Sequence, residues 1–160
     1  MIYIVMYLTA IILANLSSAY FGPSASVVNA FLFIGLDLTA RDKLHEAWHK
    51  NGLLWKMGML ISVGSLLSWL LNRNAGMIAI ASFTAFACAA LVDTIAYQFL
   101  YKKSYFLKVN GSNVFSALAD SLVFPTIAFG GFLPLITLGQ FIAKVFGGFI
   151  WSLFLNKRNK

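Results

Sequence analysis

The chain has 160 residues, of which 60% are hydrophobic and 11% are charged. Soluble domains carry about 25% charged residues, so this composition excludes an ordinary soluble protein and indicates a polytopic membrane protein. A formal net charge of +7 would suit a nucleic-acid partner, but its distribution along the chain favours membrane topology instead.

Six apolar stretches follow one another and predict six transmembrane helices. They lie at about residues 2–20, 26–44, 53–71, 76–100, 113–132 and 134–155, and each approaches the ~20 residues that a span needs. The first stretch lacks the basic start and the small-residue cleavage site of a signal peptide, so we interpret it as a retained span. We therefore expect one all-α domain over residues 1–160, a bundle of six transmembrane helices without a soluble catalytic domain.

Lysine and arginine gather on one side of this predicted bundle. Ten of the twelve lie beside the second and third spans, in the loop between the fourth and fifth spans, or in the C-terminal tail. The opposite side carries only Arg73, and Lys144 lies within the sixth span. Because basic loops of membrane proteins stay in the cytoplasm, both termini are predicted to be cytoplasmic, and no nucleic-acid partner is needed to explain the charge.

Asp120 is a carboxylate in the middle of the apolar run 113–132. Such a charge costs roughly 2.5–3.5 kcal/mol on insertion scales, so it should face the bundle interior. Helical spacing predicts companions for it. Asp93 continues a face of alanines at four-residue intervals, which allows close helix packing. Lys144, the only basic residue deep in a span, shares a helix face with Gln140. We predict that these side chains form a polar site between helices.

Further residues extend the predicted binding site: Asn15, Asn113 and Phe124, the last as a ring that stacks on a flat ligand. Asp37 and Arg41 are four residues apart and are predicted to form a structural or gating ion pair along their own helix. The alternative interpretation of the buried charges is an ion-pair clamp that only holds helices together. Charges of both signs make insertion costly, which favours a functional cavity over the clamp.

The string HEAWH, from His45 to His49, fits a zinc-binding pattern. On a helix, H-E-x-x-H places two histidines on one face for zinc and supplies Glu46 as a general base. A zinc peptidase needs a third protein ligand, and the chain has only two histidines. The basic residues around the string suit a cytoplasmic helix end. We expect no metal, no cofactor and no enzymatic activity, and an intramembrane zinc metallopeptidase remains an alternative.

Four strings, FLFIGLDLTARD, ASFTAFACAALVD, ADSLVF and QFIAKVFGGF, resemble successive signatures of the VUT family. These are six-helix bacterial membrane proteins that include the queuosine precursor transporters, and related short versions occur in phage genomes. The resemblance places family positions on Asp37 to Arg41, Asp93, Asp120, Lys144 and Asn15. Ser116 and Ala117 stand where the family pattern has a Gly-Asn pair, and Gln140 stands where it has an acid. These departures concern the substrate more than the fold.

The resemblance implies a multi-pass transporter of the bacterial inner membrane, or a phage-encoded one inserted in the host membrane. Its substrate would be a small planar purine-like metabolite, 7-cyano-7-deazaguanine or 7-aminomethyl-7-deazaguanine. Asp93 or Asp120 would accept the two adjacent donors of a guanine-like edge, and Asn113, Gln140 or Lys144 would donate to the ring carbonyl. The expected partners are this small molecule and the lipid bilayer, with a homo-oligomer left open. A non-transporting membrane scaffold or pore former is the alternative from another class.

Overall fold

In the computed structural model, the backbone is described for residues 2–48, 52–100, 102–103 and 105–157, and side chains within these ranges are described except at 34–43, 45–47, 53–54, 94, 97, 105–110, 148–149 and 151–157. The described ranges form six α-helices and a short 3-10 helix, with no strand among them. The elements are α1 (Ile2–Phe21), α2 (Pro23–Trp48), α3 (Leu53–Leu71), η1 (Arg73–Ala75), α4 (Gly76–Phe99), α5 (Tyr105–Ala128) and α6 (Pro134–Lys157). The all-α prediction is confirmed for this part of the chain.

The helix bounds lie within two residues of the predicted stretches except in α2 and α5. Helix α2 begins three residues before the predicted stretch 26–44 and ends four residues after it. Helix α5 begins at Tyr105, eight residues before the predicted start at residue 113, and ends at Ala128 instead of residue 132. Pro125 lies inside it and is buried. The chain leaves the helix just before Gly130, whose φ of 73° is left-handed. Glycine adopts this conformation without the steric cost that a Cβ imposes.

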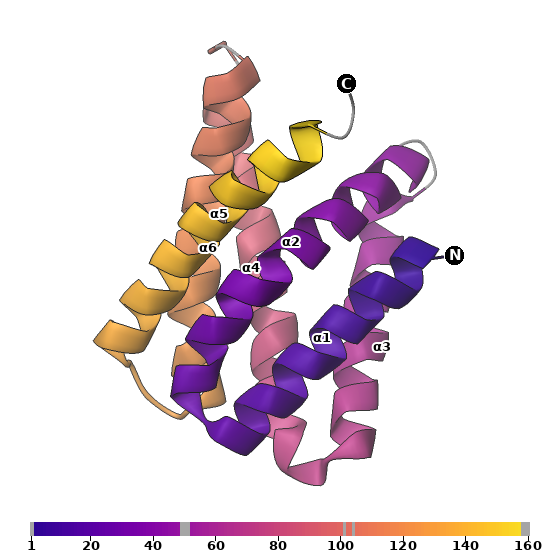
Figure 1. Ribbon diagram of the computed structural model, residues 1–160, viewed down its shortest axis with the longest axis vertical. Coiled ribbons are helices and arrows are strands. Elements are labelled where there is room, and N and C mark those ends of the chain that lie inside the picture. The colour runs from indigo at the N-terminus through magenta and orange to yellow at the C-terminus, as the bar shows by residue number, and fades with distance from the viewer. Residues whose placement is uncertain (1, 49–51, 101, 104, 158–160) are drawn as a thin grey trace.

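The helices form a closed circuit of neighbours, in which α1 contacts α2, α2 contacts α6, α6 contacts α5, α5 contacts α4, α4 contacts α3, and α3 contacts α1. In Figure 1 the starts of α1, α3 and α5 lie toward the same end of the bundle as the ends of α2, α4 and α6. We call this the terminal end. The other end, which holds η1 and the turns after α1 and α5, is called the turn end. The circuit therefore places α6 between α2 and α5.

Two glycines permit close approach between helices of this circuit. A Cβ added to Gly64 of α3 would lie 2.9 Å from Cγ2 of Ile11 in α1. A Cβ added to Gly139 of α6 would lie 3.2 Å from both γ-methyl carbons of Val27 in α2. Small residues bring helices together in this way inside membranes, where close packing helps to drive association. These contacts set the spacing of α1 against α3 and of α6 against α2.

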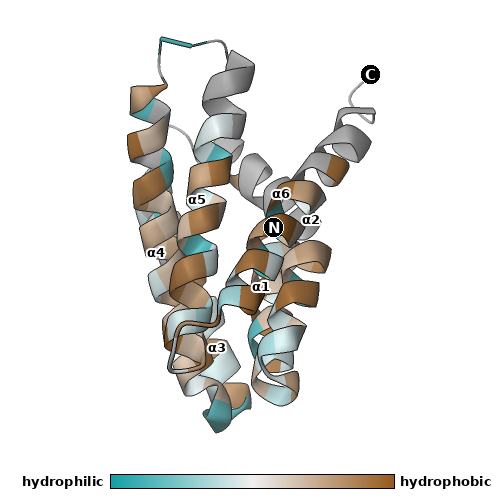
Figure 2. Ribbon diagram, turned by 90° about the vertical axis from the view of Figure 1, so that its left-hand side faces the viewer, coloured by the Kyte–Doolittle hydropathy of each residue, from teal (hydrophilic) through white to brown (hydrophobic). Residues whose placement is uncertain are grey.

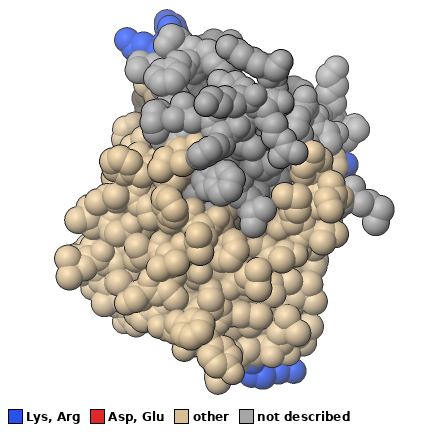
Figure 3. All heavy atoms as spheres, viewed as in Figure 1, with Lys and Arg blue, Asp and Glu red and all other residues tan. Residues whose placement is uncertain are grey.

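The outer surface of the bundle is largely apolar. Trp55, Phe99 and Leu135 are among its exposed large side chains, and Figure 2 shows hydrophobic segments along α4 and α5. On the face shown in Figure 3, Lys and Arg side chains are visible at the upper left, at the right edge and at the bottom, and the described surface between them shows no coloured charge. Charges are costly in lipid, so an uncharged surface of this kind suits contact with a bilayer.

Two helical segments are long and apolar enough to cross a membrane by themselves: Ile2–Phe21 and Arg73–Asp93. Shorter apolar helical segments are Pro23–Phe33, Trp55–Leu71 and Pro134–Gly147. Only described residues enter this comparison. The apolar helices support a membrane protein, while six complete spans and cytoplasmic termini stay predictions.

Candidate functional site

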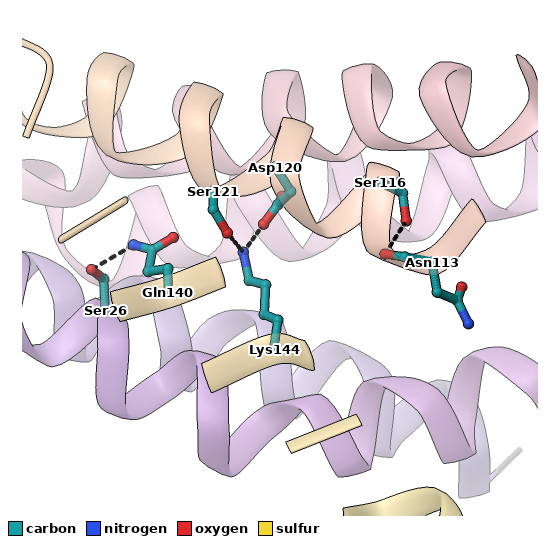
Figure 4. Close-up of polar contacts among 7 residues, drawn as sticks. All are labelled: Ser26, Asn113, Ser116, Asp120, Ser121, Gln140 and Lys144. Carbon is teal, nitrogen blue, oxygen red and sulfur yellow. Dashed lines mark hydrogen bonds and ion pairs between the residues drawn. The ribbon is translucent and has the colours of Figure 1, made fainter. Parts of the chain in front are cut away.

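An ion pair joins α5 to α6 (Figure 4). Nζ of Lys144 donates to Oδ2 of Asp120. The same nitrogen lies 3.4 Å from Oγ of Ser121, a side chain with 0% exposure. The Lys144 side chain is 15% exposed and that of Asp120 is 21% exposed. The structure therefore brings together two residues of the predicted site and adds a buried hydroxyl beside them.

Helices α5 and α6 place this ion pair well away from the turn end of the bundle. Asp120 precedes the end of α5 by eight residues and Lys144 follows the start of α6 by ten, so both lie roughly 12–15 Å from the turn end at the helical rise per residue. Pro125 is under 2% exposed and lies one turn beyond Ser121, where it removes the amide that would bond the Ser121 carbonyl. A lysine at such depth needs an anionic partner because it cannot reach water easily. Asp120 supplies that partner.

Gln140 lies one turn before Lys144 and faces α2. Its side chain is 1% exposed, and its Nε2 donates to Oγ of Ser26 at 2.7 Å. The Ser26 hydroxyl donates in turn to the carbonyl oxygen of Pro23. Figure 4 shows Gln140 and Lys144 on successive turns of α6. One face of α6 therefore makes polar contacts with both neighbouring helices.

Buried polar contacts also join α1 to α2 and α3. Nδ2 of Asn15 donates to Oγ of Ser68 at 3.2 Å, and both side chains are buried. Asn29 of α2 donates to Oγ of Ser18 at 3.1 Å and accepts from the Ser17 hydroxyl at 3.0 Å. Together with the contacts of α6, these bonds form a polar layer in the half of the bundle nearer the turn end. The layer links α3, α1, α2, α6 and α5 in that order.

Asp93 does not meet the ion pair. It lies six residues before the end of α4, whereas Asp120 lies fifteen residues after the start of α5 at Tyr105. Since α4 ends and α5 begins at the terminal end, the two carboxylates differ in height by roughly 13 Å at the helical rise per residue. Oδ1 of Asp93 is buried and has no hydrogen-bond partner among the described residues. The structure thus separates the two acids that the sequence analysis placed in one site.

Three other predicted site residues also lie apart from the pair. Asn113 is exposed, lies two turns before Asp120, and points away from Lys144 in Figure 4. The ring of Phe124 meets that of Phe129 edge to face, with centroids 6.2 Å apart. The amide of Asn15 is engaged by Ser68 between α1 and α3. Among the predicted residues whose side chains are described, the structure pairs Asp120 with Lys144 and places Gln140 one turn before Lys144.

The remaining predictions concern residues whose side chains lie outside the described part: Asp37, Arg41, His45, Glu46 and His49. The predicted ion pair along α2 and the zinc-binding alternative therefore stay untested. Among the residues that are described, no group of three or more His, Cys, Asp or Glu side chains is positioned to hold a metal ion.

Two surface cavities lie away from the ion pair. One of about 320 Å³ is lined by Trp55, Gly58, Met59, Ser62, Val63 and Phe83. The other, of about 560 Å³, is at the turn end and is lined by Leu16, Ala19, Tyr20, Leu71, Asn72 and Asn74. Neither lining includes Asp120, Lys144 or Gln140. The candidate site is therefore defined by its converging polar side chains, and these two cavities lie elsewhere.

Sequence reasoning missed the serines and the asparagine of α2 and α5 that complete the polar layer. Ser26 follows Pro23 in the first turn of α2, where short polar residues usually serve the helix end. Asn29 lies three residues further on, so the two residues share one side of the helix. That spacing was the sequence signal for a polar side of α2. It could be interpreted as a contact surface only once α2 was placed between α1 and α6.

The apolar helices support a membrane protein, and charged residues within membrane-spanning helices generally mark pathways of ions or substrates. Residues 1–156 match the family described as "Putative vitamin uptake transporter", and the chain belongs to this family. The resemblance to the VUT family is thereby confirmed. Neither the comparison with curated proteins nor that with solved structures gave a match.

Proposed function

We propose that this chain is a membrane transporter, not an enzyme, that imports a 7-deazaguanine precursor of queuosine. Membership of an uptake-transporter family supports the transport of a small molecule. The observation that carries the finer proposal is the ion pair between α5 and α6. It sets a carboxylate and an ammonium side by side among apolar helices, where charges are costly and usually functional.

The chemistry of the pair suits a guanine-like ligand. Such a ligand presents two adjacent N–H donors beside a ring carbonyl. The carboxylate of Asp120 accepts two parallel hydrogen bonds, and charge-assisted bonds of this kind are strong. Lys144 donates to the carbonyl, with the Gln140 amide one turn away. A site built for these partners rejects ligands that lack them, because its own buried groups would be left unpaired.

The remaining predicted residues keep supporting roles in the proposal. Asp93 provides a second carboxylate deeper toward the terminal end, suited to the cation of an aminomethyl-deazaguanine. Asn15, Asn113 and Phe124 line the path or stack on the base, and Asp37 with Arg41 acts as a structural or gating pair. These roles require helix movements during transport, because the side chains that the structure describes lie apart from the ion pair.

The proposed setting is the bacterial inner membrane, with six spans and cytoplasmic termini. The supporting observation is the charge distribution, since described basic side chains include Lys102 and Lys103 at the terminal end and only Arg73 at the turn end. Basic residues are retained on the cytoplasmic side during insertion. The terminal end would therefore face the cytoplasm and the turn end would receive substrate.

A non-transporting membrane scaffold is the second candidate function. It is favoured by the engagement of Lys144, Gln140 and Asn15 with other side chains of the protein. Interhelical polar bonds of this kind also stabilise membrane bundles that carry no substrate. Under this candidate function, the ion pair only holds α5 and α6 together.

The direct test is uptake of labelled 7-deazaguanines by a bacterial strain that cannot make the precursor, read out as queuosine in tRNA. Cells that express the chain should regain queuosine, and cells that express Asp120→Asn at equal membrane abundance should not. Lys102→Gln, which removes an exposed lysine far from the pair, is the matched control and should behave as wild type. Equal queuosine with and without the chain would contradict the proposed substrate.

A further inference from the structure

We infer that Lys144 is an internal competitor for the substrate at Asp120, and that it neutralises this carboxylate while the transporter returns without cargo. The inference rests on the proposed function and assigns Lys144 a role in the transport cycle instead of in recognition alone. Its basis is the contact of Nζ with Oδ2 of Asp120, the oxygen that a substrate donor would use.

Nζ on Oδ2 occupies one of that oxygen's two accepting sites and offsets the negative charge of the carboxylate. A ligand with two adjacent N–H groups therefore binds Asp120 more tightly when Nζ moves aside. Ser121 offers the place for that movement, because its buried Oγ lies 3.4 Å from Nζ. The lysine side chain has a flexible four-carbon stem, so Nζ can shift from the carboxylate toward the hydroxyl while α6 stays in place. Nζ of Lys144 therefore has two neighbouring positions, one at the carboxylate of Asp120 and one at the hydroxyl of Ser121.

The electrostatic consequence concerns the return step. When the substrate leaves, its donors no longer neutralise Asp120. A bare carboxylate among apolar helices opposes any rearrangement that keeps it away from water. Lys144 removes that penalty by closing onto Oδ2. The loaded and the empty transporter then both move with a neutralised carboxylate, whereas an empty transporter without Lys144 moves with a bare carboxylate or must first bind a proton there.

Among the described basic side chains, Lys144 is the one that contacts Asp120, whereas Lys102 and Lys103 are exposed beyond the end of α4. Arg73 stacks on Trp69 at the turn end, with its guanidinium carbon 4.0 Å from the ring centroid. Lys56 lies over the ring of Trp48 at 5.5 Å near the terminal end. Neither cation has a described contact with Asp120. The neutralising function is therefore assigned to one residue.

The test compares two fluxes of labelled 7-cyano-7-deazaguanine in vesicles that contain purified protein. Net uptake into empty vesicles requires the unloaded return, whereas exchange against unlabelled compound inside does not. In Lys144→Gln, the ratio of net uptake to exchange should fall at least about tenfold, since an unpaired intramembrane carboxylate costs more than one decade in rate. Lys144→Arg keeps the charge and should restore the ratio to near the wild-type value. The exposed-lysine control Lys102→Gln should leave both fluxes unchanged.

The outcomes separate this inference from the proposed function. Equal loss of both fluxes in Lys144→Gln, or loss of neither, overturns the competitor role while transport of the compound stands. A wild-type protein that shows neither flux overturns the proposed function, and the inference falls with it. Exchange by Lys144→Gln also proves that this variant is folded, so a selective loss of net uptake cannot arise from misfolding.

Discussion

Removing one member of the ion pair should destabilise the protein more than removing both. Asp120→Asn leaves Lys144 without an anionic partner, next to neutral acceptors that include the Ser121 hydroxyl at 3.4 Å. Stranding one charge of a fully buried pair costs about 3–5 kcal/mol. Because the two side chains keep 15% and 21% of their surface exposed, we expect about 2–3 kcal/mol in this protein, with water and local thinning absorbing the rest.

The double variant Asp120→Asn, Lys144→Gln removes both charges and leaves two amides that can hydrogen-bond. It should lose only about 1 kcal/mol relative to the wild type, the net value of a hydrogen bond. With about 2–3 kcal/mol lost in each single variant, the coupling energy of the double-mutant cycle should therefore be about 3–5 kcal/mol in magnitude. Equilibrium unfolding in mixed detergent micelles measures all four proteins. A coupling energy near zero would refute the contact on which the site is built.

The same four proteins distinguish a transport site from a clamp. If the pair only holds α5 against α6, uptake of the deazaguanine should recover in the double variant together with stability. If Asp120 binds substrate, the double variant should be stable and still inactive. Recovery of uptake to within about twofold of wild type, well under the tenfold that 1.4 kcal/mol represents, would reject the site and support the scaffold function.

Three further predictions address other parts of the molecule. Gly64→Ala should lower the free energy of unfolding by about 1–3 kcal/mol, because the new methyl group overlaps Ile11. Adding Ile11→Ala to the same chain should recover part of this loss. An unchanged unfolding midpoint in Gly64→Ala would disprove the close approach of α1 and α3. Asp93→Asn should abolish precursor uptake at normal membrane abundance, and normal uptake would remove this acid from the proposal. Purified protein should contain no stoichiometric zinc by elemental analysis, and replacing His45 and His49 together by alanine should leave uptake intact; one bound zinc per chain would revive the peptidase alternative.

The apolar pattern of the sequence was sufficient to predict an all-helical chain, and it located most helix bounds. The predicted third stretch coincides with α3, Leu53–Leu71. The start of α5 was placed too late because residues 105–112 (YFLKVNGS) are too polar to resemble a span, although they continue the helix. Hydropathy reports which residues suit lipid, whereas helix bounds depend on backbone hydrogen bonding that polar residues also support.

The contact between Asp120 and Lys144 could be anticipated because only one basic residue lies deep in a span and charges at that depth need partners. Two acids were available to Lys144, however, and no sequence pattern distinguished between them. Asp93 and Asp120 both lie on helix faces predicted to point inward. Helical periodicity predicts the direction in which a side chain points, but not its position along the bundle axis. The position of a residue along the bundle axis depends on where its helix begins. Because the start of α5 was predicted too late, the position of Asp120 relative to Asp93 was misjudged.

The partners of Gln140 and Asn15 could not be predicted for a related reason. Both are amides on predicted inward faces, yet each donates to a serine of another helix: Ser26 in α2 and Ser68 in α3. Serine side chains often hydrogen-bond to the backbone of their own helix, so the position of a serine in a sequence does not predict a contact with another helix. Only the order of helices around the bundle identifies these pairs.

The most direct test of the central claim is accumulation of labelled 7-cyano-7-deazaguanine by vesicles that contain wild-type protein or Asp120→Asn at equal density. We expect uptake by the wild type and a rate at least about tenfold lower in the variant, since losing a charge-assisted acceptor costs about 1.5–3 kcal/mol. Uptake by the variant at the wild-type rate, or wild-type vesicles no different from vesicles without protein, would contradict it.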